Sequence, residues 1–360
     1  MNHLSLTTSI AELRRAYTGE ANTTLVPTAK RILARLGQSQ LTQLSSIVNG
    51  DSGGFSGRLL GRASPTVDHK IRSAVLRDAT TRAQSELETA VLLAIGRIHS
   101  HRRFDRYLPH SELFRWVRPD ESELVLNLAP QALAAVLAEL VPREHDGRLI
   151  GVAGLRIRES RRQIELYLAD TSPEAVVLVS NISHRQLAAA LAFSGVAAGS
   201  PISPGEHPRR LSEIEALFAA SGRVPGPIDL GSAVLRRLGM LGQADRIAIE
   251  TVGSCLRLDW TGGATPASIA MLLTHPVSGL PDDTFTTTMT PDGTIILTCA
   301  GLHGSIALRR SIPATPPRDS GPTIADAWRT FDEAMAAPPD LTVVASPDAT
   351  GNATGGGIDG

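Results

Sequence analysis

The sequence predicts an α+β fold, in which an N-terminal helical region precedes two related units with the element order β-β-α-β-β-β. The main observation is a pattern that occurs twice: a short strand runs into a helix that begins at a proline, and three further strands follow. The two copies run from Glu123 to Ser180 and from Ser254 to Arg310. Before the first copy, apolar residues recur at helical spacing. We expect the two units to lie in a pseudo-twofold arrangement.

The N-terminal helical region is predicted over residues 1–110. Its first helix is expected to follow a capping-box pattern that starts at Ser9, and to end at Gly19. A second helix is expected to begin near Pro27, and a third to end at the turn signal Asn49–Gly50.

The longest helix is predicted over residues 66–100, because apolar residues recur there at intervals of four and three. The small residues Ala79 and Ala83 on its apolar face would allow another helix to approach closely. Two interpretations follow: the face packs within its own domain, or it forms the interface of a homodimer.

The first unit is assigned to residues 111–198 and the second to residues 246–312, with a helical connection over residues 199–245. Pro130 and Pro266 each begin a helix, because proline is favoured at the first helical position. We expect antiparallel sheets with helices on one face, because the strands alternate apolar and polar residues. The expected strands are residues 113–118, 155–158, 164–168 and 175–179, then 246–251, 285–288, 295–299 and 305–308; the expected helices are 131–141, 211–221, 232–240 and 267–275.

The C-terminal residues 313–360 are predicted to be mostly disordered, because Pro, Gly, Ala, Thr and Asp dominate their composition. Residues 323–336 are the exception and are expected to form a short amphipathic helix. Its apolar face carries Ile324, Trp328, Phe331 and Met335. Such a helix binds in a groove of a partner protein or folds back as a latch on its own molecule, and the sequence favours neither interpretation.

Composition indicates a soluble cytoplasmic protein. The preference for arginine over lysine, with abundant Ala, Gly and Pro, indicates a GC-rich bacterium and favours an actinobacterium. Arginine accounts for 33 of the 35 basic residues, and the net charge of −1 argues against a surface adapted throughout to nucleic acid. Cys255 and Cys299 are too few for a disulfide framework and lack metal-ligand spacing, which favours buried free thiols in a reducing compartment. Neither a signal peptide nor an apolar segment long enough to span a membrane is expected.

Motifs with a chemical role are scarce, and we predict no catalytic residue, cofactor or metal ion. The loop Gly50–Gly54 matches the serine-protease signature around Ser52, but His3 is the only histidine before this serine, no histidine segment of that family is present, and the surrounding sequence is helical in pattern. The same loop lacks the lysine of a nucleotide-binding P-loop. An enzyme of unrecognised type stays a third hypothesis, to be favoured by a deep pocket that gathers His145, His184 or His303 with a carboxylate.

An arginine cluster supports a nucleic-acid hypothesis as the first alternative. Arg97, Arg102, Arg103 and Arg106 lie close together in the sequence, with Phe104 and Tyr107 beside them. Cationic and aromatic side chains in this combination contact phosphates and stack on bases. The other interpretation is that neighbouring acidic residues pair with these arginines on a solvated surface.

The preferred hypothesis is a non-enzymatic protein-binding factor, an adaptor or chaperone whose partner is another protein of unknown identity. A duplicated scaffold, an amphipathic tail helix and a long helical face support it. Residues 154–193, three strands followed by the helix SHRQLAAALAF, resemble the sheet-plus-helix unit of the type VII secretion-associated chaperones of actinobacteria. Those chaperones also have two related halves and bind exported protein pairs, so the resemblance implies a secretion-associated role.

Overall fold

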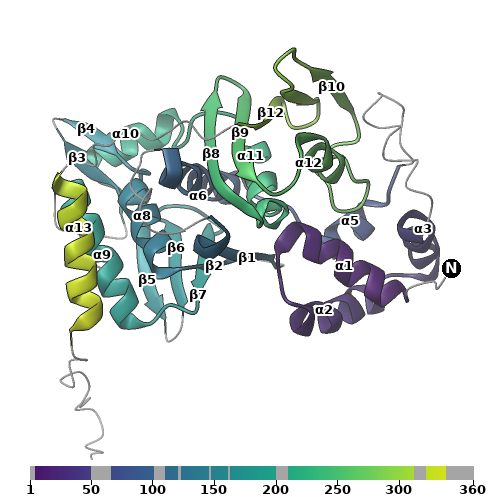
Figure 1. The fold of residues 1–360 in the computed structure, drawn as a ribbon, viewed down its shortest axis with the longest axis horizontal. Coiled ribbons are helices and arrows are strands. Elements are labelled where there is room, and N and C mark those ends of the chain that lie inside the picture. The colour runs from purple at the N-terminus through teal and green to yellow at the C-terminus, as the bar shows by residue number, and fades with distance from the viewer. Residues whose placement is uncertain are drawn as a thin grey trace, which may run out of the picture.

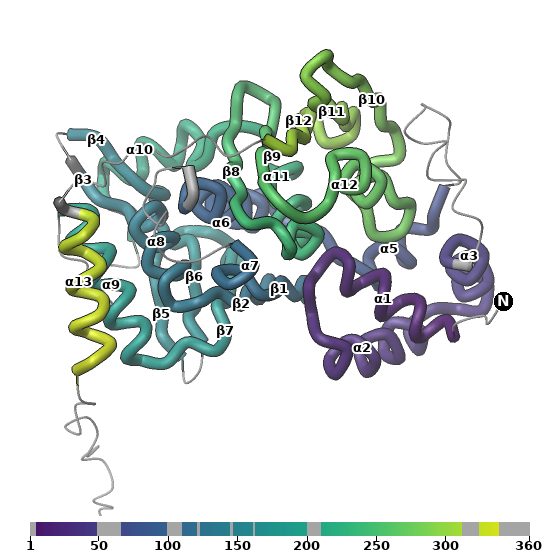
Figure 2. The backbone as a smooth tube through the Cα atoms, viewed as in Figure 1, coloured from purple at the N-terminus to yellow at the C-terminus, as the bar shows by residue number. Residues whose placement is uncertain are grey.

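The computed structural model describes residues 5–49, 66–100, 110–120, 123–145, 147–160, 163–199, 210–311 and 322–337. It has the predicted α+β fold: helices at the N-terminus precede two similar units, each built on a mixed sheet. Figure 1 shows the N-terminal helices at one end of the molecule and the C-terminal helix at the other, with the two sheets between them. The backbone trace in Figure 2 shows the same order of parts.

The N-terminal helices are α1 (Leu6–Thr18), α2 (Asn22–Ala34), α3 (Gln38–Asn49) and α5 (His69–Val75). The expected capping box at Ser9 is wrong, because the side chain of Ser5 caps α1 by accepting from the Thr8 amide at 3.3 Å. Gly19 ends α1 with a φ of 72°, as predicted for a glycine cap. The expected start of α2 near Pro27 is also wrong, since this proline lies inside the helix.

These helices have a small apolar core of their own, separate from the main core. It includes Ile10, Leu25, Leu44 and Ile71. Val277, from the loop after α12 (Pro266–Leu273), also belongs to it. The N-terminal helices are therefore held against the second unit by apolar packing.

The predicted single helix over residues 66–100 is wrong, because the chain forms α5 and then α6 (Arg82–Ser100), with an extended link between them. Leu76 in that link has φ −149° and ψ 105°, which no α-helix accommodates. Tertiary contacts hold the link: Arg236 Nη1 donates to the Arg77 carbonyl at 2.9 Å, and Arg237 Nη1 pairs with Asp78 at 2.6 Å.

Helix α6 runs through the middle of the protein and is buried over most of its length. It packs against α8 (Pro130–Leu140), α11 (Ile228–Leu235) and β8 (Ala244–Val252). A Cβ on Gly96 would lie 2.6 Å from the Ile249 backbone nitrogen, so glycine is needed where α6 crosses β8. The faces proposed for a homodimer are occupied within this chain.

Within the described residues, the strands form two five-stranded sheets and one separate hairpin. The first sheet has the order β1-β2-β7-β6-β5 and the second the order β10-β11-β12-β9-β8. The strands of the first unit are β1 (Phe114–Pro119), β2 (Leu124–Leu128), β5 (Leu155–Ser160), β6 (Gln163–Leu168) and β7 (Val176–Ser180). Those of the second unit are β8, β9 (Cys255–Gly262), β10 (Phe285–Met289), β11 (Ile295–Cys299) and β12 (Gly304–Arg310).

The expectation of purely antiparallel sheets is wrong in one respect, which is the same in both units. β2 pairs with β7 in parallel, and β9 pairs with β12 in parallel, while the other neighbours are antiparallel. In each unit a helix follows the first hairpin. The chain then returns so that the last strand of the unit lies beside the second strand of that hairpin. The repeated strand order confirms the two similar units.

Two insertions distinguish the units. The first unit carries the hairpin of β3 (Arg143–His145) and β4 (Arg148–Ile150), whereas the second carries the buried loop between α12 and β10. The helix after β7 is α9 (His184–Ala198), which packs on α8. The helix after β12 is α13 (Pro322–Ala336), which packs on α9.

The connection between the units contains α10 (Glu213–Ser221), α11 and the short 3-10 helix η1 (Leu238–Leu241). The expected helix over residues 232–240 is therefore wrong, because α11 ends at Leu235 and η1 follows it. Glu88 on α6 accepts from Arg236 Nε at 2.8 Å and from the Ser232 hydroxyl at 2.6 Å. This buried network joins the helix that leads into the first unit to the helix that leads into the second.

Candidate anion-binding pocket

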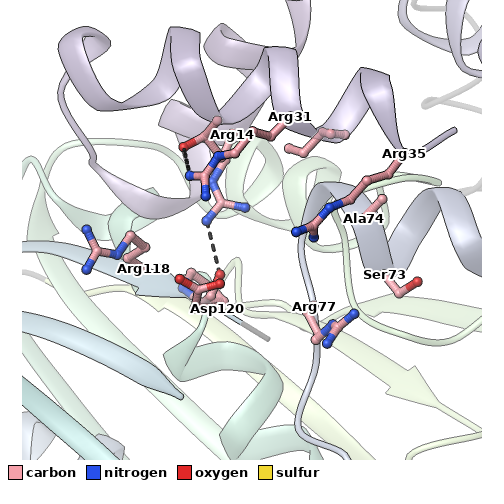
Figure 3. A pocket seen from close by; sticks show the side chains of 11 residues that line it. Arg14, Arg31, Arg35, Ser73, Ala74, Arg77, Arg118 and Asp120 are labelled. Carbon is pink, nitrogen blue, oxygen red and sulfur yellow. Dashed lines mark hydrogen bonds between the residues drawn. The ribbon is translucent and has the colours of Figure 1, made fainter. Parts of the chain in front are cut away.

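A small cavity of about 70 Å³ lies where the N-terminal helices meet the first unit. Its walls come from α1, α2, the end of α5 with the following link, and the turn between β1 and β2. Figure 3 shows the cavity and the side chains around it. The described residues that line it are Arg14, Thr28, Arg31, Ile32, Arg35, Ser73, Ala74, Arg77, Arg118, Pro119 and Asp120.

Helix α2 supplies one wall because Thr28, Arg31, Ile32 and Arg35 are spaced three, one and three residues apart and so share a helix face. Ile32 is buried in the core of the N-terminal helices and holds this face in place. Arg31 Nη2 donates to the Thr28 hydroxyl at 3.2 Å. The two arginines of α2 are exposed, so solvent reaches this wall.

Arg14 is the buried anchor of the pocket, and its guanidinium group connects three parts of the chain. Its Nε pairs with Glu20 at 3.0 Å, Nη1 donates to the Val75 carbonyl at 2.7 Å, and Nη2 donates to the Pro119 carbonyl at 3.1 Å. These bonds tie α1 to the end of α5 and to the β1–β2 turn. They fix the relative positions of the segments that carry the other arginines.

The remaining arginines come from the link after α5 and from β1. In Figure 3 the guanidinium group of Arg35 extends from the end of α2 toward Arg14 and Asp120, and Arg77 lies below it on the link. The guanidinium group of Arg118 points away from this space and lies 5.6 Å from the ring of Trp116. The buried Nε of Arg118 has no hydrogen-bond partner within the part of the chain that the structure describes.

The pocket carries an excess of positive charge. Its described lining holds five arginines and one aspartate, and four arginines remain when Arg118, whose guanidinium group points away from the space, is left out. The formal charge is then four minus one, or +3, and counting Glu20, the partner of Arg14, leaves +2. Guanidinium groups bind phosphate, sulfate and carboxylate oxygens by short charge-assisted hydrogen bonds. At about 70 Å³ the cavity is small and has room for a small oxyanion.

A second and larger cavity of about 520 Å³ adjoins the first, and Ser73 and Arg77 line both. The remaining walls come from α5, the link, the starts of α6 and α11, and two loops of the second unit. The described residues that complete its lining are His69, Arg72, Asp78, Ala79, Thr80, Ser85, Asp229, Ser232, Pro281 and Leu302.

The arginines predicted to contact nucleic acid are not the arginines of this pocket. Arg97 lies on α6, where it faces Glu139 at 3.6 Å, and Arg102, Arg103 and Arg106 lie outside the described residues. The nucleic-acid hypothesis for this cluster stays a prediction. Sequence reasoning missed the pocket because its arginines are spread over more than a hundred residues, from Arg14 to Arg118. The one local signal was Arg31 and Arg35, four residues apart on one helix.

The four tail-helix residues predicted to bind a partner lie against α9 of the same chain. The rings of Trp328 and Phe193 are 4.3 Å apart, and Phe331 is buried beside them. Ile324 and Met335 are partly buried at the edge of this contact. The latch interpretation is the arrangement that the structure adopts, and binding of this helix to another protein stays a prediction.

The other chemical candidates lie apart from the pocket. Burial, with a smaller contribution from Asp282, raises the pKa of the Cys299 thiol to about 12, and Cys255 is half-buried. His184 Nδ1 lies 2.9 Å from Glu159 on an exposed surface and not in a deep pocket. Within the described residues, no group of three or more His, Cys, Asp or Glu side chains is placed to hold a metal ion. None of the helices described is long and apolar enough to cross a membrane.

No protein-family model matches the chain, and neither a curated protein nor a solved structure shows significant similarity to it. The resemblance of residues 154–193 to secretion-associated chaperones gains no support from these comparisons.

Proposed function

We propose that this protein binds a small phosphate-bearing ligand through the arginine-lined pocket. The observation that carries the proposal is the net positive charge of the described lining, +2 with Glu20 counted and Arg118 left out, around a small cavity. A dianionic phosphate gains more from several guanidinium groups than a monoanionic carboxylate does, because it carries more charge and offers more acceptor oxygens.

The position of the pocket supports a binding role over a purely structural one. Structural arginines elsewhere in the molecule meet carboxylates at short range, as in the buried pair of Arg156 and Glu215 at 2.8 Å. The pocket brings Arg31, Arg35 and Arg77 to one concavity that is partly open to solvent, so the oxygens of an anion can reach them. Arg14, which is paired with Glu20, fixes the segments that carry them.

Binding of inorganic phosphate, measured by calorimetry and by thermal unfolding, tests the proposal. We expect the double substitution Arg31→Gln/Arg35→Gln to weaken phosphate binding at least about tenfold, since a hydrogen bond to a charged group contributes about 1.5–3 kcal/mol. Arg15→Gln is the matched control, because Arg15 is exposed on α1 and outside the lining. Equal binding by the double variant and the wild type would refute the proposal, and tighter binding to a single-stranded oligonucleotide than to phosphate would move it to nucleic acid.

A second candidate is the protein-binding factor, and one surface favours it. Leu217 and Phe218 on α10 are 70% and 39% exposed, and Ile150 on the neighbouring strand β4 is 38% exposed. Exposed apolar side chains that cluster in this way are typical of protein interfaces. Affinity purification from the native host, followed by mass spectrometry, compares the wild type with Leu217→Asp/Phe218→Asp. Met289→Asp is the control, because this exposed residue lies on β10 and not on α10. If the control variant loses the same partner, the α10 surface is not the binding surface.

A further inference from the structure

The two adjoining cavities differ in charge and size, which bears on the chemical class of the ligand. The smaller one holds the excess positive charge described above. The larger one has two arginines, Arg72 and Arg77, and two aspartates, Asp78 and Asp229, so its formal charge is two minus two, or zero with histidine neutral. Its volume of about 520 Å³ falls within the range of small-molecule pockets, about 300–1,000 Å³. The smaller cavity therefore suits a charged group, and the larger cavity suits the neutral remainder of the same ligand, which we call its body.

The larger cavity has a rigid wall, and its polar groups there are already engaged. Arg237 pairs with Asp78, and the Ser232 hydroxyl donates to Glu88. Arg72 donates to the Leu280 carbonyl and faces Asp283 at 3.5 Å. Because these groups bond within the protein, the wall keeps its shape without a ligand.

Asp229 is a polar group of this cavity that a ligand can reach, as are His69 and Thr80, which are also exposed. Asp229 lies in the first turn of α11 and is the carboxylate among the three. A carboxylate accepts hydrogen bonds only, so it favours a hydroxyl or amino group on the ligand. Pro281 and Leu302 supply apolar surface in the same lining.

Resting on the proposed function, we infer that the ligand is a phosphomonoester of a neutral small molecule that bears hydroxyl or amino groups. Its phosphate occupies the arginine-lined pocket and its body occupies the adjoining cavity, with Asp229 as hydrogen-bond acceptor. Arg77 and Ser73 lie at the junction, where the ester oxygen would pass.

Calorimetry with inorganic phosphate, ribose 5-phosphate, adenosine monophosphate and unphosphorylated ribose tests this inference. We expect at least one of the two phosphomonoesters to bind about tenfold or more tightly than phosphate, and ribose to bind more weakly than phosphate. Ala79→Phe, which fills the larger cavity, should bring the affinity for the phosphomonoesters down to the affinity that the same variant has for phosphate. Asp229→Asn should reduce the gain in affinity for the phosphomonoesters severalfold. Because Asp229 is exposed, this substitution should leave the fold intact.

The outcomes separate the inference from the function on which it rests. Equal affinity for phosphate and both phosphomonoesters would overturn the inference and leave the phosphate-binding function in place. A gain that survives both Ala79→Phe and Asp229→Asn would also overturn it, because the body would then lie elsewhere. Failure of phosphate and both phosphomonoesters to bind the wild type would overturn the proposed function itself.

Discussion

The two units share one strand order but are covered by different parts of the chain. In the first unit α8 is covered by α9, and α13 packs on the outside of α9. In the second unit α12 lies against α1: the Tyr17 hydroxyl donates to the Leu272 carbonyl at 2.8 Å, and the Tyr17 ring meets His275 edge-on. Figure 1 shows α13 and the N-terminal helices at opposite ends of the molecule. The same scaffold is thus completed once from the C-terminal side and once from the N-terminal side.

The turns at matching positions of the two units show what this difference produces. The β1–β2 turn lies against the N-terminal helices, where Pro119 accepts from Arg14 and Asp120 lines the pocket. The matching β8–β9 turn is open to solvent, with Val252 63% exposed. Because the N-terminal helices contact both units, they create at their junction a cationic cavity that the duplicated scaffold does not form alone. Asymmetric completion of a repeated fold is therefore sufficient to generate a cavity that the repeat lacks.

Breaking the connection between the halves should give the largest effect. Arg236→Leu leaves Glu88 buried without its cation, and we expect the free energy of unfolding to fall by about 3–5 kcal/mol. Urea unfolding at neutral pH measures the loss. Arg257→Leu is the control in the second unit, since this arginine is 36% exposed and its pairs with Glu250 and Asp259 should contribute about 1 kcal/mol or less. A similar loss in both variants would contradict a special role for the buried pair.

Removing the cover of the first unit should give a smaller and more local effect. Trp328→Ala deletes the ring that packs on Phe193, and we expect a loss of about 3 kcal/mol in the stability of the α13–α9 contact. Hydrogen exchange followed by mass spectrometry should show faster exchange in α13 and α9, with the strands of the second unit unchanged. Arg329→Ala, exposed on the same helix, serves as control. Equal acceleration of hydrogen exchange in both units would contradict the view that α13 covers and stabilises the first unit alone.

The repeated units were predictable from the sequence because their signals are local. Pro130 and Pro266 mark helix starts directly, and alternating residues mark strands wherever one face is buried. The parallel pairing of β2 with β7 was not predictable in this way, because it depends on where the chain returns after some fifty residues.

The link after α5 shows why other predictions were wrong. Its apolar spacing continues that of a helix, but Arg236 and Arg237 hold its backbone and side chains from more than 150 residues away. The pocket depends on the same kind of long-range contact. Arg14 reaches the Pro119 carbonyl across 105 residues of sequence, and no local pattern records such a contact.

Acidic pH should affect the edge strand β5 more than the edge strand β10, because an ion pair that can be protonated lies at β5. On β5, Arg156 pairs with Glu215 of α10, whereas no such ion pair is seen at β10 within the described residues. Burial of Glu215 opposes ionisation, but bonds from Arg156 and the amides of Ser212 and Gly154 outweigh it and lower its pKa from 4.5 to about 2.

Because the folded pKa is lower than the unfolded one, this carboxylate stabilises the protein above about pH 4.5. The contribution is lost as the pH falls toward about 2. Its size is on the order of 3 kcal/mol, at about 1.4 kcal/mol per pKa unit. We expect the stability difference between wild type and Glu215→Gln to shrink over this pH range, and Glu213→Gln, exposed on the same helix, to show no such change. A difference that is constant with pH would contradict the assignment.

The smallest expected effect concerns the contact between α1 and the second unit. Tyr17→Phe keeps the buried ring but removes the hydroxyl that donates to the Leu272 carbonyl, so we expect a loss of about 1 kcal/mol. Tyr167→Phe is the control, because its ring lies under Arg158 on the first unit at 4.8 Å and stacking does not need the hydroxyl. Burial also raises the pKa of Tyr17 above its usual range, although Arg237 opposes the shift. In alkaline absorbance titrations Tyr17 should therefore ionise only when the N-terminal helices separate from α12, and ionisation of Tyr17 in the folded protein at the ordinary tyrosine pKa would show that this contact does not close the second unit.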